Sequence, residues 1–251
     1  MKKIFYACCA VIFIALLAIL YEPLIRAGIN LYRIGDIKEK IAPHRVNSLE
    51  ALNKISILGI RKFETDLYWN PGNNNFQVCH DLEQCNSLNL ETMLEQAQHA
   101  HFIWLDLKNL SEDNAADVAS ALAKTDRRFN IKKRVVIESS DTSKALAVIS
   151  RSGFKTAYYL PTRKIIQAAD ATLAARITAH VVNNNIDNIS FDCRGYAFVE
   201  RELKPLLSAE VGYYVWNTRI SYQDKALHRA LASDRCLSDS KVRLGLIRFR
   251  Q

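Results

Sequence analysis

Apolar segments typical of strands alternate with helix-forming segments along residues 41–239, and only short turns separate them. This alternation is typical of a parallel sheet, because parallel neighbours need a long crossover connection between them. The expected strands are 41–46, 62–69, 102–107, 134–138, 155–160, 188–193, 211–216 and 235–239, with a short return at 76–79 after the turn 71–75. The expected helices are 49–58, 90–100, 114–128, 143–152, 163–183, 197–208 and 222–232.

Eight strands with helices between them suit a single closed barrel, because a chain of 251 residues has the usual size of that fold. The expected fold class is therefore α/β, a (β/α)8 TIM barrel. An open, doubly wound sheet is the alternative, but no glycine-rich phosphate loop follows the first strand.

An uncharged apolar run at 4–21 follows two lysines at the N-terminus. A run of this length is at the lower limit of what spans a bilayer as a helix. A cleaved signal peptide is the alternative, although the run ends in Tyr-Glu-Pro without a small-residue cleavage site. We expect an uncleaved single-pass anchor in the inner (cell) membrane at 1–23, a linker at 24–40 and a periplasmic barrel at 41–251.

The net charge of +8 favours acidic partners such as phosphates or anionic lipid headgroups. Nucleic acid is not expected, because the basic residues are dispersed rather than grouped with aromatic ones. Four cysteines follow the apolar run, and in an exported domain an even number permits disulfides. Cys79 and Cys85 flank an expected turn and suit a local bridge, whereas Cys193 and Cys236 lie far apart in sequence. Four buried free thiols are the alternative.

Polar side chains gather at the carboxyl ends of the expected strands, where barrels of this kind carry their chemistry. Glu64 and Asp66 are two residues apart, so on a strand both point to one face. Buried carboxylates need a cation, and hard oxygen ligands suit Ca²⁺ or Mg²⁺. The other strand-end residues are His44, Arg45, His80, Asp106, Lys108 and three weaker rim candidates, Glu138, Asp192 and Trp216. Two histidines that flank paired carboxylates suit general acid and base catalysis, and an arginine can hold a phosphate.

Taken in order, these motifs resemble the glycerophosphodiester phosphodiesterase superfamily. The motifs that carry the resemblance are His44-Arg45, Glu64-x-Asp66, His80-Asp81, Leu105-Asp106-Leu107-Lys108, Trp216-Asn217 and, as a closing strand, Leu237-Ser238-Asp239. The patterns His44-x-Val46-Asn47-Ser48 and Leu105-Asp106-x-Lys108 are similar to the menorin branch of that superfamily.

The resemblance implies a TIM barrel that cleaves glycerophosphodiesters, or lysophospholipid-like substrates, with the help of a divalent cation. By position, His44 and His80 would be the acid/base pair, and Arg45 and Lys108 would contact the phosphate. Glu64, Asp66 and Asp106 would hold the metal.

A barrel that binds a phosphorylated or polysaccharide ligand of the cell envelope without catalysis is the second hypothesis. It is motivated by Val46-Asn47-Ser48, which replaces the glycine and the Pro-Glu-Asn-Thr run usual in the family, and by Asp106 in place of a glutamate. Carboxylates of Glu64, Asp66 and Asp106 that lie within about 5 Å of one another favour the metal site. An ammonium of Lys108 between them favours the binding protein.

Overall fold

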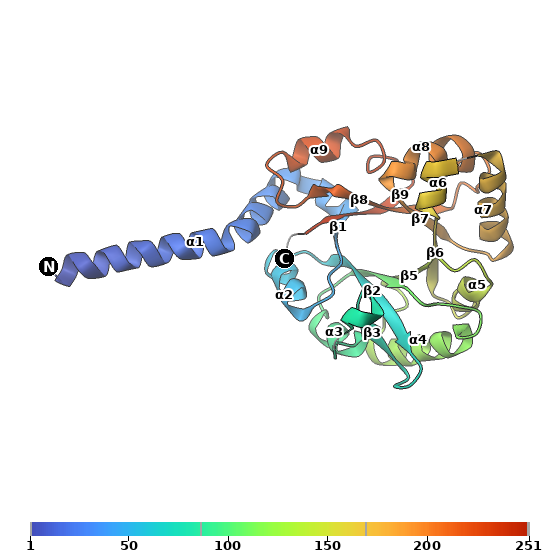
Figure 1. Ribbon diagram of the computed structural model, residues 1–251, viewed down its shortest axis with the longest axis horizontal. Coiled ribbons are helices and arrows are strands. Elements are labelled where there is room, and N and C mark those ends of the chain that lie inside the picture. The colour runs from blue at the N-terminus through green and yellow to red at the C-terminus, as the bar shows by residue number, and fades with distance from the viewer. Residues whose placement is uncertain (1, 86, 169, 250–251) are drawn as a thin grey trace.

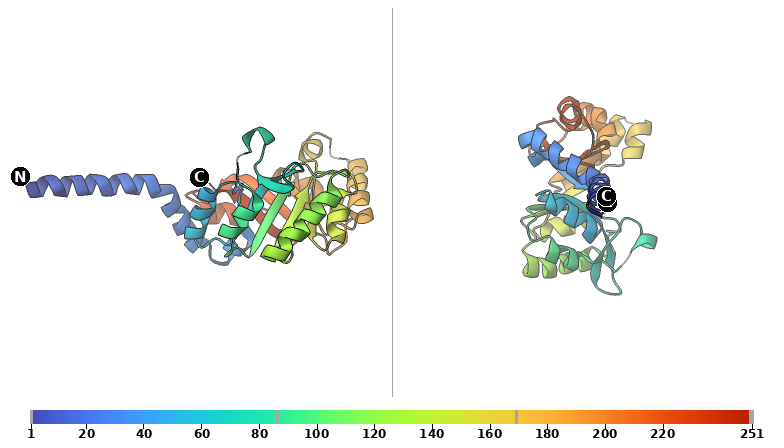
Figure 2. Two further views of the ribbon diagram at one scale, coloured as in Figure 1. Left: turned by 90° about the horizontal axis from the view of Figure 1, so that it is seen from below. Right: turned by 90° about the vertical axis from the view of Figure 1, so that its left-hand side faces the viewer.

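The computed structural model describes residues 2–85, 87–168 and 170–249. Its strands form one curled sheet in the order β1-β9-β8-β7-β6-β5-β4-β2-β3, a TIM-like barrel with helices around it (Figures 1 and 2). All neighbouring strands are parallel except the hairpin of β2 and β3. The strands are β1 Ile41–His44, β2 Lys62–Asn70, β3 Asn75–Val78, β4 Phe102–Leu107, β5 Val135–Ser139, β6 Lys155–Tyr159, β7 Asn188–Asp192, β8 Gly212–Ser221 and β9 Val242–Arg248.

Helices surround the sheet, and the N-terminal part of the first of them projects away from the domain. They are α1 Lys2–Ile34, α2 Leu49–Ile57, α3 Leu90–Gln96, α4 Ala115–Phe129, α5 Ala145–Arg151, α6 Thr162–Ala168, α7 Ala171–Asn183, α8 Tyr196–Phe198 and α9 Leu227–Ser233. Shorter helical turns are η1 Gly35–Lys40, η2 Leu82–Gln84, η3 Cys193–Gly195 and η4 Val199–Leu203. As expected, Ser48 caps α2, because its hydroxyl accepts a hydrogen bond from the Ala51 amide at 3.1 Å.

The apolar core has two parts, a large one between sheet and helices and a smaller one inside the barrel. The inner cluster consists of Ala42, Trp104, Val136, Ala157, Tyr214, Leu244 and Leu246. Side chains two residues apart on a strand point the same way, so each strand continues from this apolar layer into the layer above it. That next layer is polar and aromatic; it contains His44, Asp106, Glu138, Tyr159 and Trp216. The candidate site is therefore the layer of side chains inside the barrel at the carboxyl-terminal ends of the strands.

The last strand lies at Val242–Arg248 and not at 235–239, so the expected eighth strand and the resemblance of Leu237-Ser238-Asp239 to a closing strand were wrong. Asp234 turns the chain instead, because its carboxylate accepts a hydrogen bond from the Leu237 amide at 2.9 Å. The segment 242–248 has the stronger strand pattern, since Leu244 and Leu246 recur at period two and fill the barrel interior.

The expected helix 163–183 is divided into α6 and α7. Asp170 begins α7 as its N-cap, and its side chain accepts a hydrogen bond from the Leu173 amide at 2.7 Å.

The segment expected as a linker, 24–40, completes α1 and forms η1. Ala27, Asn30 and Ile34 are buried against the barrel. The Asn30 amide also donates hydrogen bonds to the backbone oxygens of Tyr222 at 2.6 Å and Asp224 at 3.0 Å. This part of the chain is therefore packed onto the domain.

Within the described residues, no single helix has both the length and the apolar character to cross a membrane, although Val11–Leu17 and Ile19–Lys40 meet the requirement together as a pair bent by 53°.

Both pairs of cysteines form disulfides, so the expected local bridge between Cys79 and Cys85 is confirmed. The second bridge joins Cys193 to Cys236, at a sequence separation of 43. It ties the end of β7 to the turn that precedes β9.

Replacing both Cys193 and Cys236 with alanine is expected to lower the free energy of unfolding by about 4 kcal/mol, from the loop-closure entropy that the bridge removes from the unfolded chain. The same change at Cys79 and Cys85, which are 6 residues apart, should cost about 2 kcal/mol. Denaturant unfolding of both double variants under oxidising conditions measures the difference. Equal losses would contradict the loop-length explanation.

Candidate active site

Three carboxylates meet inside the barrel, toward the carboxyl-terminal ends of the parallel strands β2 and β4. The parallel register places Asp66 beside Asp106, and Glu64 precedes Asp66 on the same face of β2. One oxygen from each of the three side chains lies within 4.8 Å of the others. Glu64 and Asp66 are buried. The residues that the sequence assigns to the metal therefore do converge.

Burial, together with the negative charges of Asp66 and Asp106, raises the pKa of Glu64 well above its usual value. Burial also raises the pKa of Asp106. For Asp66, burial acts in the same direction, but the Lys108 ammonium and the hydrogen bonds to its carboxylate outweigh it, and the pKa is lowered. The three side chains thus share one low-dielectric site in which a further positive charge would favour their ionised forms.

Lys108 supplies one positive charge to this cluster. Its ammonium lies 2.7 Å from Oδ1 of Asp66 and also donates a hydrogen bond to Oδ2 of Asp106. Burial lowers the pKa of Lys108, but the two aspartates outweigh this effect and raise it above the usual value. The three carboxylates converge as a metal site requires, and the Lys108 ammonium bridges two of them as the binding-protein hypothesis expects.

Arg45 connects the metal-site candidates to the histidines. Its backbone adopts a positive φ of 61°, and its amide donates to Oε2 of Glu64 at 2.6 Å. Its guanidinium lies 2.7 Å from Nε2 of His80. Because a guanidinium only donates, Nε2 must accept, and the ring proton of a neutral His80 lies on Nδ1, which is 3.0 Å from Oδ1 of Asp81.

His44 ends β1 on the other side of the carboxylates, with Nε2 at 3.7 Å from Oε2 of Glu64. Burial, reinforced by the positive charge of Arg45, lowers the pKa of His44 to about 4. The ring is therefore neutral at neutral pH, and a neutral imidazole can accept a proton.

Most of the predicted residues line one small cavity of about 160 Å³. Its lining consists of His44, Arg45, Glu64, His80, Asp106, Lys108, Glu138, Tyr159, Trp216 and Leu246. Of the three rim candidates, Glu138 and Trp216 therefore line the cavity. Asp192 is not part of the lining, and its carboxylate is held by the Arg194 guanidinium at 2.7 Å.

The sequence reasoning did not assign roles to Asn47 and Tyr159. The Asn47 amide donates to Oδ2 of Asp66 at 2.6 Å and accepts from the Asp66 amide at 3.0 Å. It thereby fixes the orientation of the Asp66 side chain. Its position three residues after His44, just after an expected strand, is a sequence signal for this role, and Tyr159 carries no comparable signal. The Tyr159 ring stands edge-on to Trp216, with centroids 5.1 Å apart.

Among the described residues, β1 and β2 are not hydrogen-bonded to each other as neighbouring strands. The loop after β1, which carries Arg45 and Asn47, forms hydrogen bonds with β2 instead. The Val46 amide donates to the Glu64 carbonyl at 2.9 Å. The barrel therefore closes directly beside the carboxylates.

Glu138 accepts hydrogen bonds from Nε1 of Trp104 at 2.6 Å and from the Ser190 hydroxyl. Burial, together with the charge of Asp106, raises its pKa well above the usual value. A carboxyl with a raised folded-state pKa stabilises the fold below its unfolded pKa, and this contribution is lost as pH rises through the folded value.

Without added cation, the free energy of unfolding should therefore fall more steeply with rising pH, above about pH 4, in the parent than in Glu138→Gln. Denaturant unfolding at a series of pH values measures the two slopes. Glu138→Ala is the contrasting variant, because it leaves the buried Trp104 N–H without its acceptor, at a cost of about 1–3 kcal/mol. Parallel pH profiles for parent and Glu138→Gln would contradict a protonated Glu138.

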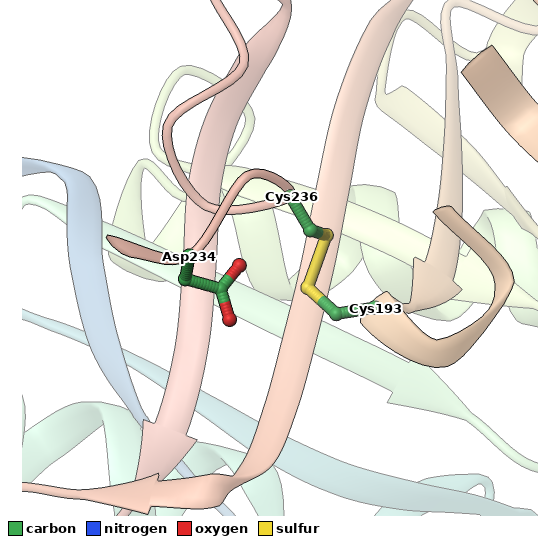
Figure 3. Close-up of side chains that lie close together, drawn as sticks. All are labelled: Cys193, Asp234 and Cys236. Carbon is green, nitrogen blue, oxygen red and sulfur yellow. A yellow bond between two sulfur atoms is a disulfide. The ribbon is translucent and has the colours of Figure 1, made fainter. Parts of the chain in front are cut away.

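A second group of potential ligands, Cys193, Asp234 and Cys236, lies near the end of β7 (Figure 3). Both sulfur atoms belong to one disulfide, so neither can act as a thiolate ligand. Asp234 accepts hydrogen bonds from the Asn217 side chain at 2.6 Å and from the Leu237 amide. This group is structural.

The carboxylate cluster fits a hard divalent cation. It offers three carboxylates, and Oε1 of Glu64 is buried without a hydrogen-bond partner among the described residues. Three carboxylates against the single ammonium of Lys108 leave room for further positive charge.

No family model matches the chain, and no curated protein matches it. Several solved structures resemble it, and three of them illustrate the likeness. A glycerophosphodiester phosphodiesterase from Parabacteroides distasonis superposes with a TM-score of 0.59 at 15% identity, over 83% of this chain and 92% of that one. Proteins named as glycerophosphoryl diester phosphodiesterases from Silicibacter pomeroyi and Agrobacterium tumefaciens give TM-scores of 0.56 and 0.59 at 14% and 12% identity. They are matched over 89% and 94% of their lengths and cover 83% and 84% of this chain. At these identities the likeness shows that this chain has the fold of the phosphodiesterase structures.

Proposed function

We propose that the protein is a phosphodiester hydrolase that depends on a divalent cation and acts on glycerophosphodiesters or lysophospholipid-like substrates. The observation that carries this proposal is the convergence of Glu64, Asp66 and Asp106 within 4.8 Å of one another. Glu64 and Asp106 line a cavity that His44 and His80 also line. The fold shared with the phosphodiesterase structures supports it.

Glu64, Asp66 and Asp106 would hold the cation, Ca²⁺ or Mg²⁺. When bound, the ion supplies positive charge that polarises the phosphoryl group. Arg45 and Lys108 reach the same cavity and would offset the charge that develops on the phosphoryl oxygens.

His44 is suited to the base role, since its neutral ring can take a proton from the water molecule that attacks phosphorus. His80 is suited to the acid role. A phosphate that draws the Arg45 guanidinium away from Nε2 would free this atom to take up a proton from solvent, which it could then deliver to the departing oxygen. Asp81 would stabilise the protonated ring through Nδ1. The products are an alcohol and a phosphomonoester.

We also propose that residues 1–23 anchor the chain in the membrane, with the barrel on the periplasmic side. The large apolar side chains that α1 exposes between Val11 and Tyr21 support an anchor. Such an anchor would keep the site near substrates derived from lipids.

The position of Lys108 favours one other function, a barrel that binds a phosphorylated or polysaccharide ligand without catalysis. Its ammonium already bridges Asp66 and Asp106 and could substitute for a metal ion as their counter-charge.

The deciding experiment is a phosphodiesterase assay of the full chain in detergent on a panel of glycerophosphodiesters and lysophospholipids, with chelator, Ca²⁺ or Mg²⁺. Turnover that requires the cation and is lost in Asp66→Asn would support the hydrolase. If a folded protein that binds the cation turns over no member of the panel, the hydrolase proposal is wrong for these substrates.

A further inference from the structure

A cavity of about 530 Å³ lies at the opposite end of the barrel from the candidate active site. Its walls are formed by the end of α1, by η1 and by the starts of β2 and β4. Within the part of the chain that the structure describes, it shares no lining residue with the cavity that His44 and Glu64 line. The two cavities are therefore separate.

Positive charge dominates the lining of this basal cavity. Lys38, Arg61 and Lys62 are its cations, and Glu39 is its only carboxylate. Lys62 neutralises Glu39, with Nζ at 2.9 Å from Oε2. Among the described residues, no carboxylate forms an ion pair with Lys38 or Arg61.

The Arg61 guanidinium faces a ring nitrogen instead of an acid. Nη1 lies 3.2 Å from Nε2 of His101. A guanidinium stays charged and can only donate, so Nε2 of His101 is the acceptor in this contact. This contact leaves the charge of Arg61 uncompensated.

We infer that the basal cavity binds an anion that carries a phosphate group, with Arg61 and Lys38 as its principal ligands. An arginine fork beside a lysine is the arrangement that suits phosphate oxygens. The volume exceeds what inorganic phosphate needs and lies in the range of sites that hold small organic ligands.

Because α1 lines this cavity and exposes apolar side chains, the phosphate could belong to the headgroup of a phospholipid. Tyr32 of α1 lines the cavity and is 90% exposed, and Ile25 and Ile29 on the same helix are also exposed. The helix continues from there to the exposed apolar residues 19–21 and 11–17 (Figure 2). A soluble phosphorylated molecule is the other source, with the same chemistry.

The test is isothermal titration of the full chain in detergent, with chelator present, using two probes. These are dihexanoyl phosphatidylglycerol and inorganic phosphate. The cavity variant is Lys38→Ala with Arg61→Ala. The matched control is Lys124→Ala with Arg127→Ala, which removes the same two charges from the exposed face of α4.

Loss of both cations is expected to weaken binding about a hundredfold, since each charged hydrogen bond contributes on the order of one decade in affinity. The control variant should bind as the parent does. Weakening confined to the lipid probe identifies a headgroup site, and weakening seen also with inorganic phosphate identifies a general phosphate site.

The inference is overturned if neither probe binds, if the cavity variant binds as the parent does, or if the control variant loses as much affinity. Both variants change exposed residues, and melting curves check that they are folded. Because the readout is binding without metal, a failed phosphodiesterase assay has no bearing on this result.

Discussion

Replacement of His44 with alanine is expected to lower the turnover of a glycerophosphodiester by about 10²- to 10⁴-fold, the usual contribution of a general acid or base. The imidazole lies 3.7 Å from Glu64 at the edge of the cavity, and its lowered pKa keeps it ready to accept a proton. Turnover under saturating substrate and cation measures the effect, and calorimetry should show that divalent-cation binding survives.

His228→Ala is the matched control for this variant. His228 is exposed on α9, outside the residues that line the cavity. It should retain the turnover of the parent. If His44→Ala also keeps full turnover, His44 is not the base, and the acid/base assignment has to move to another residue.

Replacement of Lys108 with methionine is expected to make folding depend on a divalent cation. Without its ammonium, Asp66 and Asp106 lose their ion pairs in a buried site. Breaking a fully buried pair costs about 3–5 kcal/mol. Because 21% of the Lys108 side chain is exposed, we expect about 2–3 kcal/mol in chelator.

Added Ca²⁺ or Mg²⁺ should restore much of this loss, because the ion binds only the folded cluster. The measurement is denaturant unfolding with chelator and with each cation. Lys54→Met serves as control, since Lys54 pairs with Glu50 on the surface of α2 and contributes only about 0.5 kcal/mol. Equal stabilisation of Lys108→Met and parent by the cation would argue that the carboxylates do not bind it.

The same variant separates the two proposed functions. If Lys108 only balances charge in a binding protein, a cation-loaded Lys108→Met should bind its ligand as the parent does. If Lys108 contacts phosphate in an enzyme, turnover should fall even when the cation restores stability.

The sequence alone correctly predicted which side chains share a face of a strand and which lie near the end of one. The spacing of Glu64 and Asp66 placed both on one face, and the strand ends at His44, Asp106 and Glu138 were assigned to the correct end of the barrel. Hydrophobic periodicity and turn residues carry this information, because both act over a few neighbouring residues.

Pairing between distant segments was decided by tertiary structure. The closing strand moved to Val242–Arg248, since its register against β1 and β8 depends on contacts across the whole barrel. Asp192 accepts a hydrogen bond from the Arg194 guanidinium and does not line the cavity, although it lies near the end of a strand as Glu138 does. A strand-end position alone did not distinguish these two residues.

By itself, the sequence determined the alternation of strands and helices, the rim that carries the chemistry and the candidate ligands Glu64, Asp66 and Asp106. Only the tertiary structure showed that Lys108 lies between two of those ligands and that Asn47 orients one of them. The same holds for the basic cavity where α1 meets the base of the barrel. The physical reason is that local propensity fixes which way a side chain points, whereas its neighbours depend on the register and closure of strands far apart in the chain.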